Sequence, residues 1–135
     1  MRYDEIVIGQ SASYTKQVTD DDVMAFARIT GDFNPVHVDE AAGAKSRFGN
    51  RIAHGMLSGG LVSAAIANTL PGPGAIYLAQ TMRFTAPVRI DDTITVTLTV
   101  TELLSKKRLK LSTLCRNQKG EMVLDGEATI LMDES

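Results

Sequence analysis

The sequence predicts an α+β fold in which an antiparallel sheet of about five strands wraps around one long, buried helix. Two patterns carry this prediction. The first is a nearly charge-free segment, residues 55–70, whose apolar and small side chains leave no face of a helix polar. The second is a two-residue alternation of apolar and polar side chains that dominates the chain after Ala75. No linker or internal repeat interrupts the 135 residues, so we expect a single domain, residues 1–135.

Capping residues and helical spacing predict the helices. Thr19, followed by three aspartates, caps a helix that ends at Gly31. A loop covers residues 31–38, and Asp39 then caps a short surface helix over residues 40–47. The buried helix begins at Gly55 and ends before the segment 71–74, which alternates proline and glycine.

Period-two alternation predicts the strands. We expect them over residues 11–18, 76–84, 93–101, 109–115 and 122–132, with 11–18 at an edge of the sheet. Residues 118–121 form the turn of the last hairpin. A sheet of this kind around one helix is the hot-dog architecture.

Composition excludes several classes of protein. The formal net charge of -2 provides no basic surface for nucleic acid. No run approaches the roughly 20 apolar residues that span a bilayer, and the N-terminus lacks the apolar stretch of a secretory signal. One cysteine, Cys115, forms neither an internal disulfide nor a metal site by itself. We therefore expect a cytoplasmic protein with no nucleic-acid or membrane partner.

The first candidate site is the segment Asp32-Phe-Asn-Pro-Val-His37. A carboxylate and an imidazole in one loop can converge, and together they form the smallest set of groups that moves protons near neutral pH. Pro35 stiffens the loop between them. An isolated pair with this spacing is more often a surface acid and an ordinary loop histidine.

The second candidate site is the start of the buried helix, at His54 and Gly55. The first N–H groups of a helix have no intrahelical acceptor, and they favour a developing negative charge. Gly55 would let a thioester carbonyl approach the main chain, as in an oxyanion hole. The alternatives are a simple helix cap at Gly55 and a hydrogen-bonded core histidine at His54.

Taken together, these segments resemble the MaoC-like family of (R)-specific enoyl-CoA hydratases, also called hydratase 2. The matching blocks are Asp32-Phe-Asn-Pro-Val-His37, Ile52-Ala-His-Gly-Met56, and Tyr77-Leu-Ala-Gln80 followed by Phe84 and Pro87. Their order and spacing are similar throughout, and the length is similar to that of short bacterial members that supply polyhydroxyalkanoate monomers. The resemblance implies the reversible hydration of trans-2-enoyl-CoA to (R)-3-hydroxyacyl-CoA.

The resemblance also implies a role for each matching residue. Asp32 and His37 match the catalytic pair that holds a water molecule, and Gly55 matches the N–H that polarises the thioester carbonyl. Asn34 matches a residue that supports this pair or the substrate, and Ser63 matches a polar residue near the catalytic groups. We place Asn34, Ser63 and His54 among the substrate-binding residues.

Further expectations concern cofactors, assembly and CoA. Hydration requires no metal or redox cofactor, and the chain has no dinucleotide glycine motif. A homodimer would join two sheets at an exposed edge. For the CoA phosphates the candidates are four arginines: Arg47, Arg51, Arg83 and Arg89.

Three alternatives share the predicted fold. A dehydratase would perform the same chemistry on an acyl-carrier-protein thioester, giving an (R)-3-hydroxyacyl-[acyl-carrier-protein] dehydratase. A hot-dog thioesterase would place an acid on the central helix, but residues 56–70 contain none. A non-catalytic acyl-CoA-binding module would have lost one member of the acid–base pair, yet both are present.

Overall fold

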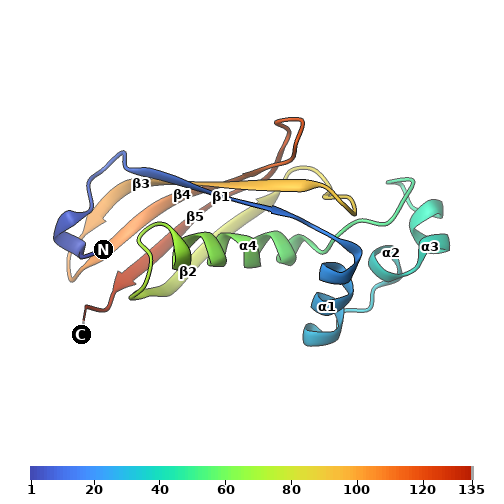
Figure 1. Ribbon diagram of the computed structural model, residues 1–135, viewed down its shortest axis with the longest axis horizontal. Coiled ribbons are helices and arrows are strands. Elements are labelled where there is room, and N and C mark those ends of the chain that lie inside the picture. The colour runs from blue at the N-terminus through green and yellow to red at the C-terminus, as the bar shows by residue number, and fades with distance from the viewer. Residues whose placement is uncertain (135) are drawn as a thin grey trace.

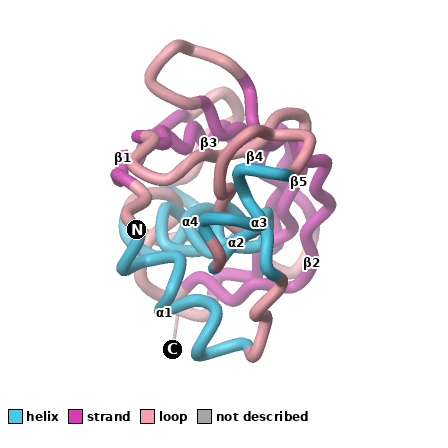
Figure 2. Tube along the Cα trace, turned by 90° about the vertical axis from the view of Figure 1, so that its right-hand side faces the viewer, coloured by secondary structure: helices cyan, strands magenta, loops and turns pink. Residues whose placement is uncertain are grey.

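The computed structural model describes residues 1–134 as one sheet packed on one long helix, with the three shorter α-helices gathered at one end (Figure 1). The sheet is five-stranded and antiparallel, in the order β1-β3-β4-β5-β2. Viewed from the end that carries the short helices, the strands curl around the long helix (Figure 2). The predicted α+β, hot-dog fold is therefore confirmed.

The strands follow the predicted alternation closely. They are β1 (Ser11–Gln17), β2 (Ala75–Phe84), β3 (Thr93–Leu104), β4 (Arg108–Arg116) and β5 (Met122–Met132). On β3 and β4, alternate side chains are buried over most of each strand, because one face of the sheet packs on the core and the other faces outward. The expected hairpin turn lies between β4 and β5, and β1 is an edge strand as predicted.

The three helices that the sequence predicts begin where it places their starts, and the structure adds two short helical turns. Together they are the 3-10 turn η1 (Tyr3–Glu5), α1 (Asp20–Thr30), α2 (Pro35–Val38), α3 (Glu40–Lys45) and α4 (Gly55–Asn68). Thr19 caps α1 through its hydroxyl, which accepts from the N–H of Asp22. Gly31 ends α1 with a φ of 82°, a left-handed conformation that favours glycine.

Residues 31–38 differ from the expected loop, because they contain the single helical turn α2. Pro35 occupies its first position, where the fixed φ of proline suits a helix and the missing N–H costs nothing. Asp39 then caps α3 by accepting from the N–H of Ala41, as predicted. The consequence for the site is that His37 sits on a single helical turn and not in an irregular loop.

The long helix α4 is buried on one face only, which corrects the expectation of a helix buried on all sides. Ser58, Leu61, Val62, Ala65 and Ile66 are buried against the sheet. The opposite face carries exposed residues: Met56, Gly60, Ser63 and Ala67. A single five-stranded sheet covers only one side of the helix, so apolar and small residues remain uncovered on the other.

The hydrophobic core lies between α4 and the inner face of the sheet. Many of its largest fully buried side chains come from β3, β4 and β5, including Ile94, Leu98, Leu109, Leu111 and Ile130. Within residues 1–134, no helix is both long enough and apolar enough to cross a membrane.

Candidate active site

His37 is held at the end of the molecule where the short helices meet the start of α4. Its ring Nδ1 lies 2.8 Å from the main-chain oxygen of Ile52. A carbonyl oxygen only accepts, so Nδ1 carries a proton, and in the neutral imidazole Nε2 presents a lone pair. The residue is 9% exposed.

Asp32 follows α1 directly and is exposed. Its Oδ1 accepts from the main-chain N–H of Asn34 at 3.2 Å, so the carboxylate has one fixed oxygen. Asn34 therefore supports the acid through its main chain, and its carbonyl accepts from the N–H of His37 at 2.9 Å. The main chain of Asn34 thus links Asp32 to His37, while the predicted role of its side chain stays a prediction.

His54 lies behind the pair rather than at its open side. Its Nε2 is 3.0 Å from the main-chain oxygen of Asp32, and its ring packs on that of His37 with centroids 4.0 Å apart. Phe26 packs on His54 with a centroid distance of 4.7 Å. The His54 side chain is 2% exposed, and its Nδ1 is buried without a hydrogen-bond partner. His54, predicted to bind substrate, therefore contacts both Asp32 and His37.

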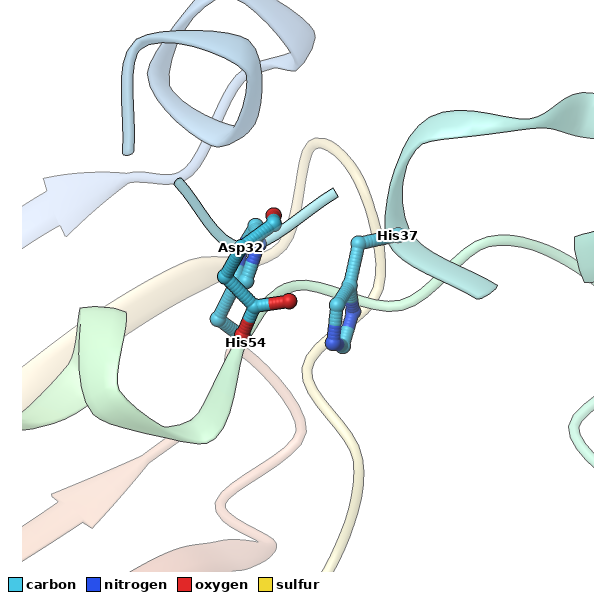
Figure 3. Close-up of side chains that lie close together, drawn as sticks. All are labelled: Asp32, His37 and His54. Atoms are coloured by element: carbon cyan, nitrogen blue, oxygen red, sulfur yellow. Dashed lines mark hydrogen bonds between the residues drawn. The ribbon is translucent and has the colours of Figure 1, made fainter. Parts of the chain in front are cut away.

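Figure 3 shows Asp32, His37 and His54 converging from two segments of the chain. One potential ligand atom from each residue lies within 4.8 Å of the others. A water with two hydrogen bonds of about 2.8 Å at a tetrahedral angle bridges atoms about 4.6 Å apart. A separation of up to 4.8 Å therefore leaves room for a water molecule to bridge two of these side chains.

Gly55, the first residue of α4, lies next to this cluster. Its N–H is one of the four at the start of a helix that have no intrahelical acceptor. A Cβ added at Gly55 would lie 2.9 Å from the ring of Phe84, so a larger residue would displace that ring. The position thus combines an available N–H with a close approach that requires glycine.

A cavity of about 480 Å³ opens over these residues. Asp32, His37, His54 and Gly55 line it together, and apolar side chains such as Phe84 and Val88 form other parts of the wall. A concave, largely apolar site with a few polar groups is typical of a small-molecule pocket.

Two serines on α4 differ in their relation to this cavity. Ser63, expected near the catalytic groups, lies on the exposed face of α4 and is not among the residues that line the cavity. Ser58 is 3% exposed and lines it. Sequence reasoning missed Ser58, although helical spacing was a signal: Ser58 stands three residues after Gly55 and four after His54, on the same helix face.

The four candidate arginines have different surroundings. Arg51 is buried and bonded to carboxylates, so it does not offer its charge to a phosphate. Arg89 donates to the main-chain oxygen of Phe48 at 2.8 Å. Arg83 lines a separate hollow on β2 with acidic neighbours. Only Arg47, among these four, is both exposed and part of the cavity wall.

Cys115 is not a candidate nucleophile. Its side chain is fully buried on β4, and burial raises the pKa of the thiol to about 12. A thiol with this pKa remains protonated at neutral pH, and the protonated form is a poor nucleophile.

Comparison with known proteins places the chain among a group of thioester-processing enzymes. The MaoC like domain family matches residues 6–120. An (R)-specific enoyl-CoA hydratase of Rhodospirillum rubrum is 45% identical over 96% of this chain and 90% of its own length. A 3-hydroxybutyryl-CoA dehydratase of Methylorubrum extorquens is 43% identical over 95% of this chain and 82% of its own.

A solved structure extends the similarity to the fold. The unliganded R-hydratase of Pseudomonas aeruginosa superposes with a TM-score of 0.95 and 51% identity, over 99% of this chain and 86% of that chain. A mitochondrial 3-hydroxyacyl-[acyl-carrier-protein] dehydratase of Solanum lycopersicum is also similar, at 35% identity over 93% of this chain and 76% of its own.

Proposed function

The chain belongs to the MaoC-like domain family, and from this premise we propose that it is an (R)-specific enoyl-CoA hydratase, a hydro-lyase. The observation that carries the proposal is that Asp32, His37 and His54 each bring a potential ligand atom to within 4.8 Å of the others, in a cavity that Gly55 at the start of α4 also lines. The substrate is a trans-2-enoyl-CoA, and the product is a 3-hydroxyacyl-CoA.

The acid–base pair performs the two proton transfers of hydration. An enoyl thioester is electrophilic at C3, because its carbonyl withdraws electrons through the double bond. Water bound between Asp32 and His37 loses one proton to the pair as its oxygen bonds to C3, and the pair delivers one proton to C2. Since Nδ1 of His37 is engaged by Ile52, Nε2 is the nitrogen that faces this exchange. Positioned proton transfer contributes roughly 10²–10⁴-fold.

The N–H of Gly55 stabilises the negative charge that develops on the thioester oxygen when C3 is attacked. Removing one such donor from an oxyanion hole typically costs about 10²–10³-fold in rate. Water addition is not a redox reaction, so no step requires a redox cofactor. In this proposal the acid–base pair and the Gly55 N–H fill the proton-transfer and oxyanion roles without a metal ion.

Two assays test the reaction and its stereochemistry. Purified protein should consume the enoyl absorbance of crotonyl-CoA, and the product should be the (R)-3-hydroxyacyl thioester. An (S)-specific hydroxyacyl-CoA dehydrogenase added to the reaction should then form no NADH. Steady NADH formation without an epimerase would exclude the (R)-specific reaction.

The second candidate function is the same reaction on an acyl-carrier-protein thioester. The similarity to the Solanum lycopersicum dehydratase favours it, since both thioesters present the same acyl group to the catalytic pair. The identity to the Rhodospirillum rubrum hydratase is higher, so we propose CoA as the carrier. Comparing kcat/KM for crotonyl-CoA and crotonyl-acyl-carrier protein decides between the carriers.

The residues present argue against the two remaining alternatives. A thioesterase of this fold needs a carboxylate on the central helix, and α4 contains no acidic residue. A non-catalytic binding module needs no intact acid–base pair, whereas Asp32 and His37 are both present and linked through Asn34.

A homodimer is part of the proposal, because the two edges of the sheet differ. The exposed positions of β1 are polar: Ser11, Ser13, Thr15 and Gln17. The other edge strand, β2, exposes Ile76 and Leu78 by 41% and 44%. Next to it, Met56 of α4 is 54% exposed, and a hollow of about 270 Å³ lies between β2 and α4. An uncovered apolar edge of this kind is normally paired, so we place the dimer contact at β2.

Light scattering should give about twice the chain mass of 14.6 kDa. Leu78→Lys places a charge on the β2 edge and should produce a monomer with reduced activity. Ser13→Lys, the matched control on the β1 edge, should remain a dimer. An active monomer at catalytic concentrations would contradict the assembly.

The cellular context completes the proposal. We place the enzyme in the cytoplasm, in fatty-acid metabolism, where it would supply (R)-3-hydroxyacyl-CoA for polyhydroxyalkanoate synthesis. Locating a tagged chain by fractionation tests the compartment.

A further inference from the structure

We propose that Arg51 is a positioning residue. Its hydrogen bond to the main chain of α2 keeps the His37 side chain where it can take part in proton transfer. The inference rests on the proposed role of His37. Nε of Arg51 donates to the main-chain oxygen of His37 at 2.6 Å. The next residue, Ile52, accepts from Nδ1 of His37 at 2.8 Å. Two consecutive residues therefore hold the histidine at its main chain and at its ring.

The remaining donors of Arg51 anchor it to two other helices. Nη2 donates to Asp20 in the first turn of α1 at 2.7 Å, and Nη1 donates to Glu40 in the first turn of α3 at 3.1 Å. One side chain thus connects α1, α2 and α3, which surround the catalytic segment. A planar guanidinium can satisfy three acceptors in different directions, whereas an ammonium on a flexible stem fixes no such geometry.

The surroundings of Arg51 bury its side chain, pair its charge and pack closely against it. Its side chain is 6% exposed. Although burial by itself lowers the pKa of Arg51, the hydrogen bonds to Asp20 and Glu40 outweigh it and leave that pKa raised, so the charge is retained. At Gly43 of α3, an added Cβ would lie 2.5 Å from the main-chain nitrogen of Arg51 and 2.8 Å from its Cγ. Glycine at this position lets α3 pack directly on the arginine.

The hydrogen bond from Arg51 matters because α2 is only four residues long. A single helical turn has no appreciable stability of its own, so its position depends on contacts with the rest of the fold. A misplacement of about 1 Å between reacting groups costs on the order of 10²-fold in rate. Loss of the hydrogen bond to the main chain of His37 should therefore lower kcat more than it weakens substrate binding.

Kinetics of three variants test this role. Arg51→Met should lower kcat by about thirtyfold and change KM by less than about threefold. Arg51→Lys should recover part of the loss, because it restores the charge and one donor. Lys16→Met, which breaks the ion pair to Asp22 on α1 without contacting α2, is the control and should keep kcat within about twofold.

A spectroscopic measurement separates positioning from simple stabilisation. The chain has two histidines, so ¹⁵N NMR of labelled imidazoles gives two sets of signals, which His54→Gln assigns. Arg51→Met should change the tautomer signals of His37, and Lys16→Met should not. This measurement needs no enzymatic activity. It therefore tests whether Arg51 positions His37 even if the protein hydrates no enoyl thioester.

If Arg51→Met left kcat and the His37 signals unchanged, the inference would be wrong. A lower Tm would not rescue it, because stability without an effect on His37 is a purely structural role. If Arg51→Met fails to fold, Asp20→Asn and Glu40→Gln replace it, since both carboxylates are largely exposed. Each should lower kcat by about two- to fivefold and perturb the same His37 signals. Wild-type kcat and signals in both would overturn the inference equally.

Discussion

The two histidines of this protein lie in contact, yet their surroundings differ. Each ring has one nitrogen next to a main-chain oxygen, of Ile52 for His37 and of Asp32 for His54. The other nitrogen of His37 is left to face the cavity, whereas Nδ1 of His54 is closed off without a partner. Adjacent imidazoles can therefore divide into one that exchanges protons and one that holds its neighbours in place.

The largest expected effect is at His37. His37→Gln should lower kcat for crotonyl-CoA hydration by at least about a hundredfold, because it removes a proton-transfer group at the site of water activation. Circular dichroism and the Tm should show that the fold persists. Retention of more than about a tenth of wild-type turnover would mean that His37 is not catalytic.

Asp32→Asn should have a comparable effect, again about a hundredfold or more in kcat. The amide keeps the size of the side chain and an oxygen for the Asn34 N–H, so the loop should retain its shape. Steady-state kinetics with a Tm control measure this change. A loss confined to KM would indicate that Asp32 binds substrate and takes no part in proton transfer.

His54→Phe should reduce kcat by about tenfold, a smaller loss than at His37. Phenylalanine keeps an aromatic ring between Phe26 and His37 but removes the hydrogen bond to Asp32, which is worth about 1 kcal/mol. Kinetics of the two histidine variants side by side test the difference. If His54→Phe lost as much activity as His37→Gln, the division of tasks between the two rings would be wrong.

The smallest effect is expected at Ser58, which lies in the cavity wall but has no place in the proton transfers. Ser58→Ala should change kcat by no more than about threefold, the scale of one modest hydrogen bond or packing contact. Full progress curves with crotonyl-CoA measure it. A hundredfold loss would add Ser58 to the catalytic residues.

Local features of the sequence predicted much of the fold. Caps at Thr19 and Asp39 and the stop at Gly31 placed helix ends, because these side chains and conformations act within a few residues. The alternation along β3 and β4 identified the inward face, because successive side chains in a strand point to opposite sides. The α2 turn was missed, since a single turn leaves almost no periodic pattern to detect.

Within the candidate site, the spacing of Asp32 and His37 and the glycine at the start of α4 were visible in the sequence. The partners of Arg51 were not. Asp20, Glu40 and His37 are separated from Arg51 by 31, 11 and 14 residues, and they meet it only after three helices pack together. The sequence therefore indicates Arg51 as a candidate phosphate ligand, because its burial depends on how these helices pack.

By itself, the sequence determined the architecture and predicted an acid–base pair, because periodicity, caps and a compact motif all act over short stretches of chain. Tertiary structure decided which face of α4 is covered, which serine reaches the cavity and which histidine keeps a nitrogen open to it. These outcomes depend on how the sheet curls and on contacts between distant residues, and neither is encoded in local spacing.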